Sequence, residues 1–273
     1  PLVNLKVTQG VNTSYTDASG TLLGLNTGVA TFDLEGLWSG VKTNGVTPSF
    51  TATLLTGTNA ISFDNDANIR ELSAYFHVNI VHDYMKTFYP SFTGMDNALE
   101  TNVDLTTDNC NAFYDGSSIN FYAAANGCAS FAQIGDVVYH EYGHGINDQY
   151  YQSIGSFWQN GAMGEGYADI WALGITENPV LGVGNSATDA TSYIRRYDLE
   201  PMVYPQDITG EVHNDGEIIA GAWWDLGVNF GNTQQMMALY AETFNGAVTG
   251  ADGTEGQVYV DILIEALTDD DVV

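Results

Sequence analysis

Two histidines that lie four positions apart, with a glutamate directly after the first, limit the fold of this chain more than any other feature. They are His140, Glu141 and His144, in the segment VVYHEYGHGINDQ at 137–149. On an α-helix, side chains four positions apart lie on one face, nearly above each other. The spacing predicts a helix at about 134–151 whose two imidazoles present their nitrogens to one point.

This arrangement of side chains is typical of a zinc site. Catalytic zinc takes three protein ligands and leaves its fourth position to water, and a carboxylate beside that water can take its proton. His140 and His144 supply two ligands, and Glu141 supplies the base. The alternative is an ordinary helix with two satisfied histidines.

A second helical stretch offers the third ligand. The segment GAMGEGYADIWA contains Glu165, and Asp169 follows about one helical turn later. We expect Glu165 to reach the metal, while Asp169 accepts the spare N–H of a zinc-bound imidazole and fixes its tautomer. The alternative is an acidic helix face that holds no metal.

The charge balance excludes several classes of partner. The chain has 273 residues, with 34 acidic and 6 basic side chains and a formal net charge of -28. Nucleic acid and acidic membrane surfaces would be repelled, and no apolar run approaches the roughly 18 residues that span a bilayer. We expect a soluble chain without nucleic-acid or membrane partners, long enough for one large domain or two joined lobes.

Cysteine usage and the first residue both indicate secretion. Cys110 and Cys128 are the only cysteines and lie in a segment rich in Asn, Gly and Ser. We favour a disulfide, which predicts an oxidising, extracellular setting, over two buried free thiols. Pro1 is not an initiator methionine, so we expect a signal peptide, and with it a pro-segment, to lie outside this sequence.

The pattern of the chain changes near residue 66. Residues 1–63 alternate apolar and polar positions between turn segments, which predicts strands, and a helix is predicted at 66–89. The stretch 91–133 is expected to be mostly loop, with one β-like run at SINFYAAA. Further helices are expected at about 162–177, 214–228, 233–245 and 256–267. The prediction is an α+β fold with a β-rich lobe at 1–152, ending in the HExxH helix, and a mainly helical lobe at 153–273.

HEYGH followed by GEGYAD resembles the gluzincin metallopeptidases, especially the fungalysin and thermolysin-like families. NAFYDG is similar to the edge strand with which those families hold an extended substrate. IRRYDLEP is similar to the segment with their substrate-carbonyl arginine, and GEVHNDGEIIAGAWWDL to the segment with their transition-state histidine. The resemblance covers roughly residues 66–228, while residues 1–60 match nothing recognised.

The resemblance implies a thermolysin-like two-lobed fold, with the active-site cleft between the lobes, and a zinc endopeptidase that acts on peptides or proteins. Asn111 and the backbone of Ala112 would hold the substrate, Arg196 rather than Arg195 would bind its carbonyl, and His213 would stabilise the oxyanion. The plainer alternatives are a turn cap at Asn111, a buried ion pair at Arg196 and a satisfied loop histidine at His213.

Two details of the family pattern stay open in this sequence. Trp158 stands where thermolysin-like enzymes place a tyrosine that helps to bind the oxyanion, and other tyrosines that could serve are Tyr150, Tyr151 and Tyr167. Asp136 aligns with a calcium ligand of the thermolysin group and Glu177 lies close to another, so calcium is a second candidate cofactor. Related sequences continue into a final helix, which makes a further C-terminal segment a candidate partner.

Two other functions compete with the endopeptidase. A gluzincin aminopeptidase needs an acidic anchor for the free N-terminus of its substrate, and no GxMEN-like stretch supplies it. A surface or binding module with structural zinc would usually close its site with four protein ligands, whereas the sequence offers three.

Overall fold

The alternating N-terminal segments form strands, as predicted. In the computed structural model, which describes residues 1–270, strand β3 (Gly28–Gly36) buries Ala30, Phe32 and Leu34 on one face. Successive side chains on a strand point to opposite faces, so this face packs on the core while the other is more exposed. The other strands of this sheet are β1 (Leu5–Gln9), β2 (Asn12–Tyr15), β4 (Ser39–Thr43), β5 (Ser49–Leu54), β6 (Leu99–Leu105), β7 (Ala112–Tyr114) and β8 (Ser118–Tyr122).

The order of the strands leaves β7 at one edge of the sheet. The order is β2-β1-β3-β4-β6-β8-β7, and β5 pairs with β3 beside this path. Strands β4, β6 and β8 are parallel, while β7 is antiparallel to β8. Within residues 1–270, no strand pairs with the outer side of β7, which therefore presents free backbone N–H and C=O groups.

Strand β6 corrects the prediction that 91–133 is mostly loop. It buries Leu99, Thr101 and Val103, and polar residues lie between them. The sequence signal is weak because Asn and Asp are depleted in strands. Parallel pairing with β4 and β8, which are distant in sequence, fixes this segment as a strand.

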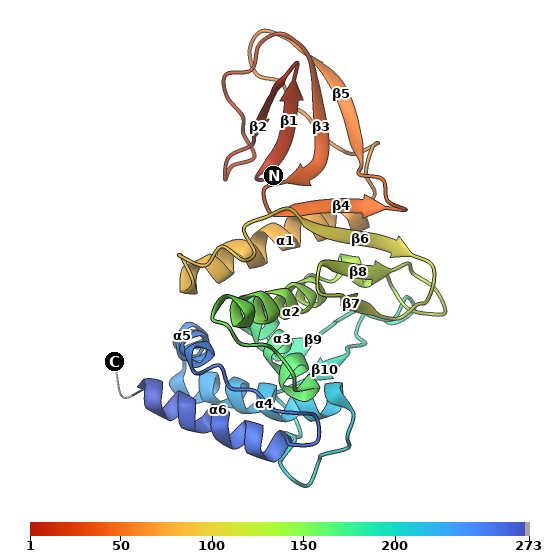
Figure 1. Cartoon of the computed structure of the whole chain (residues 1–273). Helices are drawn as coiled ribbons and strands as arrows, with labels where there is room; N and C mark the ends of the chain where they lie inside the picture. Colours follow the sequence, from red (N-terminus) through yellow and green to blue (C-terminus); the bar gives the residue numbers. More distant parts are fainter. Residues whose placement is uncertain (271–273) are drawn as a thin grey trace.

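The helices lie close to their predicted positions and make up most of the second half of the chain (Figure 1). The first begins at Asn68, whose side chain accepts from the N–H groups of Arg70 and Glu71 in a capping box. It packs against β4, β6 and the next helix, α2. The helices are α1 (Ile69–Phe88), α2 (Gly135–Ser153), α3 (Gly161–Thr176), α4 (Val212–Phe230), α5 (Thr233–Thr243) and α6 (Glu255–Asp270). Short elements are η1 (Phe131–Gln133), η2 (Phe244–Gly246) and the paired strands β9 (Val180–Leu181) and β10 (Arg195–Arg196).

An aromatic cluster fixes α3 within the helical half. Trp171 of α3 is fully buried, and its ring centroid lies 5.5 Å from that of Tyr240 on α5 and 6.1 Å from that of Tyr89, which follows α1. Burying a large apolar side chain stabilises a fold by roughly 2–3 kcal/mol, and edge-to-face aromatic pairs add to this. The cluster therefore holds α3 at a set position between α2 and α4.

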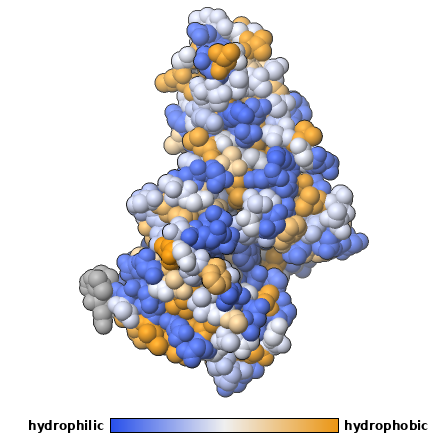
Figure 2. Space-filling model, in the orientation of Figure 1, coloured by the Kyte–Doolittle hydropathy of each residue, from blue (hydrophilic) through white to orange (hydrophobic). Residues whose placement is uncertain are grey.

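Cys110 and Cys128 form a disulfide, which confirms the predicted bridge over the alternative of two free thiols. The bridge joins the residue that precedes Asn111 to the loop after β8. Among residues 1–270, no helix has the length and apolar character needed to cross a bilayer. On the face shown in Figure 2, hydrophilic residues cover much of the surface, with apolar residues between them. Helix α6 exposes the apolar side chains Val260, Leu263, Ile264 and Leu267.

Candidate metal centre and active-site cleft

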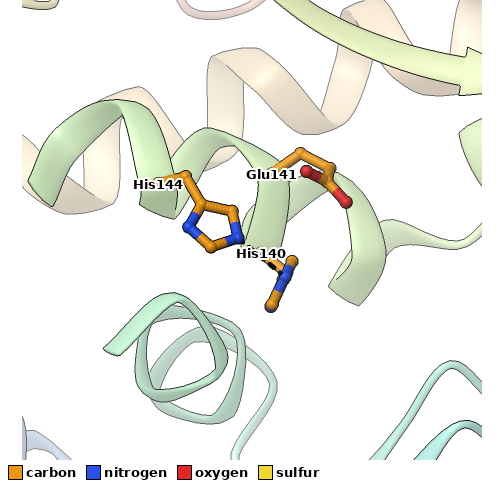
Figure 3. A group of neighbouring side chains, drawn as sticks. All are labelled: His140, Glu141 and His144. Carbon is orange, nitrogen blue, oxygen red and sulfur yellow. Dashed lines mark hydrogen bonds between the residues drawn. The ribbon is translucent and has the colours of Figure 1, made fainter. Parts of the chain in front are cut away.

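Helix α2 places His140, Glu141 and His144 together (Figure 3). One ligand atom from each side chain lies within 4.8 Å of the others. The two imidazole centroids are 4.6 Å apart, and the rings are nearly perpendicular. His140 and Glu141 are buried, with 5% and 4% of their surface exposed. The helical spacing predicted from the sequence is thus observed.

Glu165 of α3 reaches the same point. His140 Nε2 and His144 Nε2 are 3.1 Å apart, and they lie 3.3 and 3.6 Å from Glu165 Oε2 and Oε1, respectively. Zinc bonds of about 2.0–2.1 Å in tetrahedral geometry place ligand atoms about 3.3 Å apart. Glu165 Oε2 is buried and has no hydrogen-bond partner among the described residues. These three residues therefore fit a zinc ion in spacing and in chemistry.

Asp169 orients His140 by contacting Nδ1, the ring nitrogen that faces away from the metal position. Its Oδ1 lies 2.5 Å from His140 Nδ1, and Arg195 donates to both of its oxygens, at 2.6 and 2.7 Å. Tyr197 donates a further hydrogen bond to Asp169. Burial opposes ionisation of Asp169, yet the charges of Arg195 and His140 hold its pKa well below the ordinary value. A permanent carboxylate at Nδ1 leaves Nε2 of His140 facing the metal position.

The electrostatics of the site favour a cation. Burial lowers the pKa of His140, but Asp169 and Glu165 outweigh this effect and raise it to about 10. Burial opposes ionisation of Glu165 as well, yet His144 and His140 hold its pKa far below the usual range. Burial raises the pKa of Glu141 above its ordinary value, which makes this carboxylate a stronger base.

A cleft of about 700 Å³ opens onto these residues. Its lining includes Asn111, Ala112 and the following residues of the edge strand β7, together with Leu181 and Ile194. The cleft is therefore lined by residues of both the sheet and the helical half. A second hollow, of about 780 Å³, lies between the ends of α1 and α2 and helix α5. Tyr150 lines it, whereas the candidate zinc ligands, Glu141 and His213 do not.

The two adjacent arginines, Arg195 and Arg196, differ in where their side chains lie. Arg195 lines the cleft and is bound to Asp169, whereas Arg196 points away, pairs with Asp198 at 2.6 Å and lies over the ring of Tyr193. Both residues belong to strand β10, where neighbouring side chains point to opposite faces. Of the two arginines, Arg195 alone lines the cleft.

His213 also lines the cleft, from the first turn of α4. Its Nε2 lies 3.5 Å from Glu165 Oε2, and its Nδ1 lies 2.7 Å from Glu211 Oε1. Glu211 is the N-cap of α4, so the residue that starts the helix also orients the histidine.

Trp158 lines the cleft, while the three tyrosines Tyr150, Tyr151 and Tyr167 do not. The indole Nε1–H of Trp158 is buried and has no acceptor among the described residues. Its ring packs on Tyr151, with centroids 4.4 Å apart.

The structure does not gather Asp136 and Glu177 into a metal site. Asp136 accepts from the Gly182 N–H at 3.1 Å, and its Oδ1 is buried without a partner. Glu177 is exposed at the end of α3, where Gln234 donates to it at 3.2 Å. Among residues 1–270, neither belongs to a group of three or more converging His, Cys, Asp or Glu side chains.

The sequence did not reveal Tyr197 as a site residue, and its resemblance to the family favoured Arg196 over Arg195 as the arginine that binds the substrate carbonyl. No local signal marks Tyr197, since its partner Asp169 is 28 positions away. The alternation of side chains along a strand would have separated the two arginines, had the two-residue strand β10 been recognised.

Comparisons with known proteins place these residues in a family. Residues 2–148 match the model described as "Thermolysin metallopeptidase, catalytic domain", and residues 118–268 match the model described as "Fungalysin metallopeptidase". The matches reach beyond 66–228 at both ends, so the expectation that residues 1–60 match nothing is wrong. A comparison with curated proteins found no match.

Among solved structures, the chain is similar to the precursor of protealysin, a metalloproteinase from Serratia proteamaculans. The TM-score is 0.55 at 15% sequence identity, over 76% of this chain and 79% of that chain. This likeness confirms the predicted thermolysin-like fold. Together with the two family models, it shows that the chain belongs to the thermolysin-like gluzincin metallopeptidases, which are zinc peptidases.

Proposed function

We propose that this protein is a secreted zinc-dependent endopeptidase in which Glu141 is the general base. The observation that carries the proposal is the convergence of His140, His144 and Glu165, with ligand atoms 3.1 to 3.6 Å apart at the floor of an open cleft. Zinc in this position supplies a Lewis acid that polarises a carbonyl and lowers the pKa of water. The disulfide supports secretion, because disulfides persist in oxidising compartments.

Three residues of the chain would carry out proton transfer, stabilisation of the oxyanion and orientation of the substrate. Glu141 takes the proton of the attacking water and passes it to the leaving amine. His213, oriented by Glu211, donates from Nε2 to the oxyanion that develops at the scissile carbonyl. Arg195, held by Asp169, orients a substrate carbonyl, the role that the family resemblance implied for Arg196.

The substrate binds as an added strand in this proposal. Strand β7 has a free outer edge, and its first residues, with Asn111 before them, line the cleft. An extended peptide can pair with such an edge through main-chain hydrogen bonds. Asn111 and the backbone of Ala112 are the groups that would make the first contacts. The lobes at 1–152 and 153–273 flank the cleft in the same proposal.

The acids of the cleft favour an endopeptidase over an aminopeptidase. Among the residues that line the cleft, Glu141 and Glu165 are the only carboxylates, and both belong to the zinc site. No further carboxylate of the cleft is left to anchor a free N-terminus. The test is a cleavage-site profile on a mixed peptide library with blocked N-termini, with and without a chelator. Internal cuts that the chelator abolishes support the proposal, and dependence on a free N-terminus contradicts it.

The Glu141→Gln variant tests the catalytic assignment against a zinc-stabilised binding module. The amide keeps the shape of the side chain but cannot accept a proton, so we expect kcat to fall about a hundredfold or more. Zinc content, measured by elemental analysis, should stay at the parent's level because Glu141 is not a ligand. Cleavage of a denatured protein is the activity readout.

Asp225→Asn is the matched control, because it makes the same acid-to-amide change at an exposed position of α4. We expect its activity to equal the parent's. A Glu141→Gln variant that keeps zinc and cuts at the parent's rate would contradict the assignment of Glu141 as the general base. A parent that binds zinc and cuts nothing would favour the binding module.

Two further parts of the proposal concern calcium and a pro-segment. Asp136, with one buried and unpartnered oxygen, supports a calcium ion near the start of α2. The similar solved structure is of a precursor, which supports a pro-segment as a partner of this chain.

A further inference from the structure

The disulfide lies inside the substrate cleft rather than at a remote part of the surface. Both Cys110 and Cys128 line the cleft, and Cys110 directly precedes Asn111. Cys110 is exposed and Cys128 is half-buried, so solvent reaches the bridge. No step of the proposed reaction uses these sulfurs.

Without the bridge, the start of the edge strand is weakly held. Strand β7 has three residues and a single neighbouring strand, β8. Near its start, the Tyr122 N–H donates to the Asn111 carbonyl at 3.3 Å, which is a long bond. Cys110 itself has a φ of 56°, in the left-handed region that L-residues other than Asn and Asp rarely adopt. Without the bridge, nothing covalent would hold Cys110 in this conformation, and the position of Asn111 would be less fixed.

The other end of the bridge is fixed to a different segment of the cleft lining. Cys128 forms a β-bridge with Ser186, and the Ala129 N–H donates to the Asn185 carbonyl at 2.9 Å. Asn185 lines the cleft with Leu181. The disulfide is therefore a strut that joins the start of the edge strand covalently to the Cys128 loop, which is in turn hydrogen-bonded to the 181–187 segment.

We propose that the Cys110–Cys128 disulfide positions the part of the cleft beyond Asn111, so that tight binding of long extended peptides requires it. The inference rests on the proposed peptidase function. Peptides that pair with β7 and continue past Asn111 pass beside the strut. Peptides that end near the scissile bond do not reach it. The bridge thus affects the affinity for long peptides more than for short ones, because it fixes the relative positions of β7 and the 181–187 segment.

The experiment compares the parent with Cys110→Ala/Cys128→Ala on two peptides that share one cleavable bond. The short peptide has about one residue on each side of the bond and the long one about four, because each added residue extends a strand by about 3.3 Å. We expect KM for the long peptide to rise about tenfold as preorganisation is lost, with kcat, zinc content and the short-peptide KM within about twofold of the parent.

A rescue variant separates backbone position from contact with the sulfur atoms. Cys110→Asn/Cys128→Ala lacks the bridge, but Asn accepts the left-handed conformation better than Ala. We expect it to recover part of the long-peptide affinity. Equal KM values for this variant and the double alanine variant would overturn the positioning role.

Chemical reduction of the folded parent gives the same comparison without a substitution. A trialkylphosphine cleaves the S–S bond to two thiols, with the protons supplied by water, and becomes the phosphine oxide. An unchanged length preference in the reduced protein and in the double alanine variant would overturn the inference. A parallel loss of zinc and of activity on both peptides would also overturn it, because the bridge would then be merely structural. Failure of the proposed function looks different, since the oxidised parent itself would cut neither peptide.

Discussion

Asp136 is an acid near the metal centre whose carboxylate is only partly satisfied by hydrogen bonds. It lies in the first turn of α2, accepts one hydrogen bond from the Gly182 N–H and keeps its Oδ1 buried without a partner. Burial is the main cause that raises its pKa from the ordinary 3.8 to about 6. Ionised Asp136 therefore costs folding free energy unless a cation compensates it.

This cost gives a pH dependence with a defined sign. Between pH 3.8 and about 6, the folded protein keeps a proton on Asp136 that the unfolded chain has released. The stability from this group is thus fully present below the unfolded pKa and is lost as the pH rises through about 6. Asp136→Asn cannot ionise, so we expect it to be more stable than the parent at neutral pH by on the order of 2 kcal/mol.

Urea unfolding in calcium-free buffer with zinc present, at acidic and at neutral pH, measures the effect. The parent should lose stability relative to Asp136→Asn as the pH rises. Identical pH profiles for the two proteins would contradict the assignment. Added calcium should stabilise the parent and leave the variant unchanged if Asp136 binds the ion, as proposed.

At the scale of elements, the contact between α3 and α4 sets the position of Glu165 relative to His213. The two helices meet at glycines: a methyl group on Gly166 would collide with Ile219 and with the Gly216 carbonyl, and one on Gly216 would lie 2.8 Å from the Ala162 carbonyl oxygen. Any larger side chain there would push the helices apart. Two site residues on different helices would then move relative to each other.

Gly166→Ala tests this contact. Overpacking a close helix contact costs about 1–3 kcal/mol, and we expect urea stability to fall by this amount. Zinc affinity, measured by competition with a chelator, should fall as well, because Glu165 precedes the substituted residue.

Gly221→Ala on α4 is the matched control. Its added methyl would lie 3.7 Å from Tyr197, which is ordinary contact. The same substitution there should gain roughly 0.5–1 kcal/mol of helix stability and leave zinc affinity unchanged. Equal losses in both variants would show that the close approach of the helices is not the cause.

At the scale of the whole molecule, negative charge dominates. All 6 lysines and arginines of the chain are engaged in ion pairs, which leaves most of its 34 acids without a basic partner. Repulsion among unpaired acids destabilises the compact state. Salt screens such repulsion, since the Debye length falls from about 30 Å at 0.01 M to about 8 Å at 0.15 M.

We therefore expect the melting temperature to rise with ionic strength, by about 3 °C or more between low and physiological salt at constant zinc. Thermal unfolding followed by circular dichroism is the measurement. Sodium chloride and choline chloride should act alike, which distinguishes screening from binding of a particular cation. A melting temperature that falls with salt would mean that the ion pairs outweigh the repulsion.

The sequence by itself determined the local features of the protein. The facing histidines of α2, the extents of the helices and the strands of the first half follow from spacing and periodicity, which neighbouring residues set among themselves. The disulfide also followed, because the chain has only two cysteines. The family was also predicted from the sequence, because the HEYGH and GEGYAD motifs resemble those of the gluzincin metallopeptidases.

The tertiary structure alone decided what depends on partners far apart in the chain. Strand β6 forms because β4 and β8 pair with it, despite its polar residues. Arg195 rather than Arg196 faces the cleft because pairing of β10 with β9 fixes which side each arginine occupies. The position of the disulfide across the cleft depends on contacts of Cys128 with Ser186. Long-range contacts of this kind leave no periodic signal in sequence, since their free energy depends on three-dimensional neighbours rather than on adjacent residues.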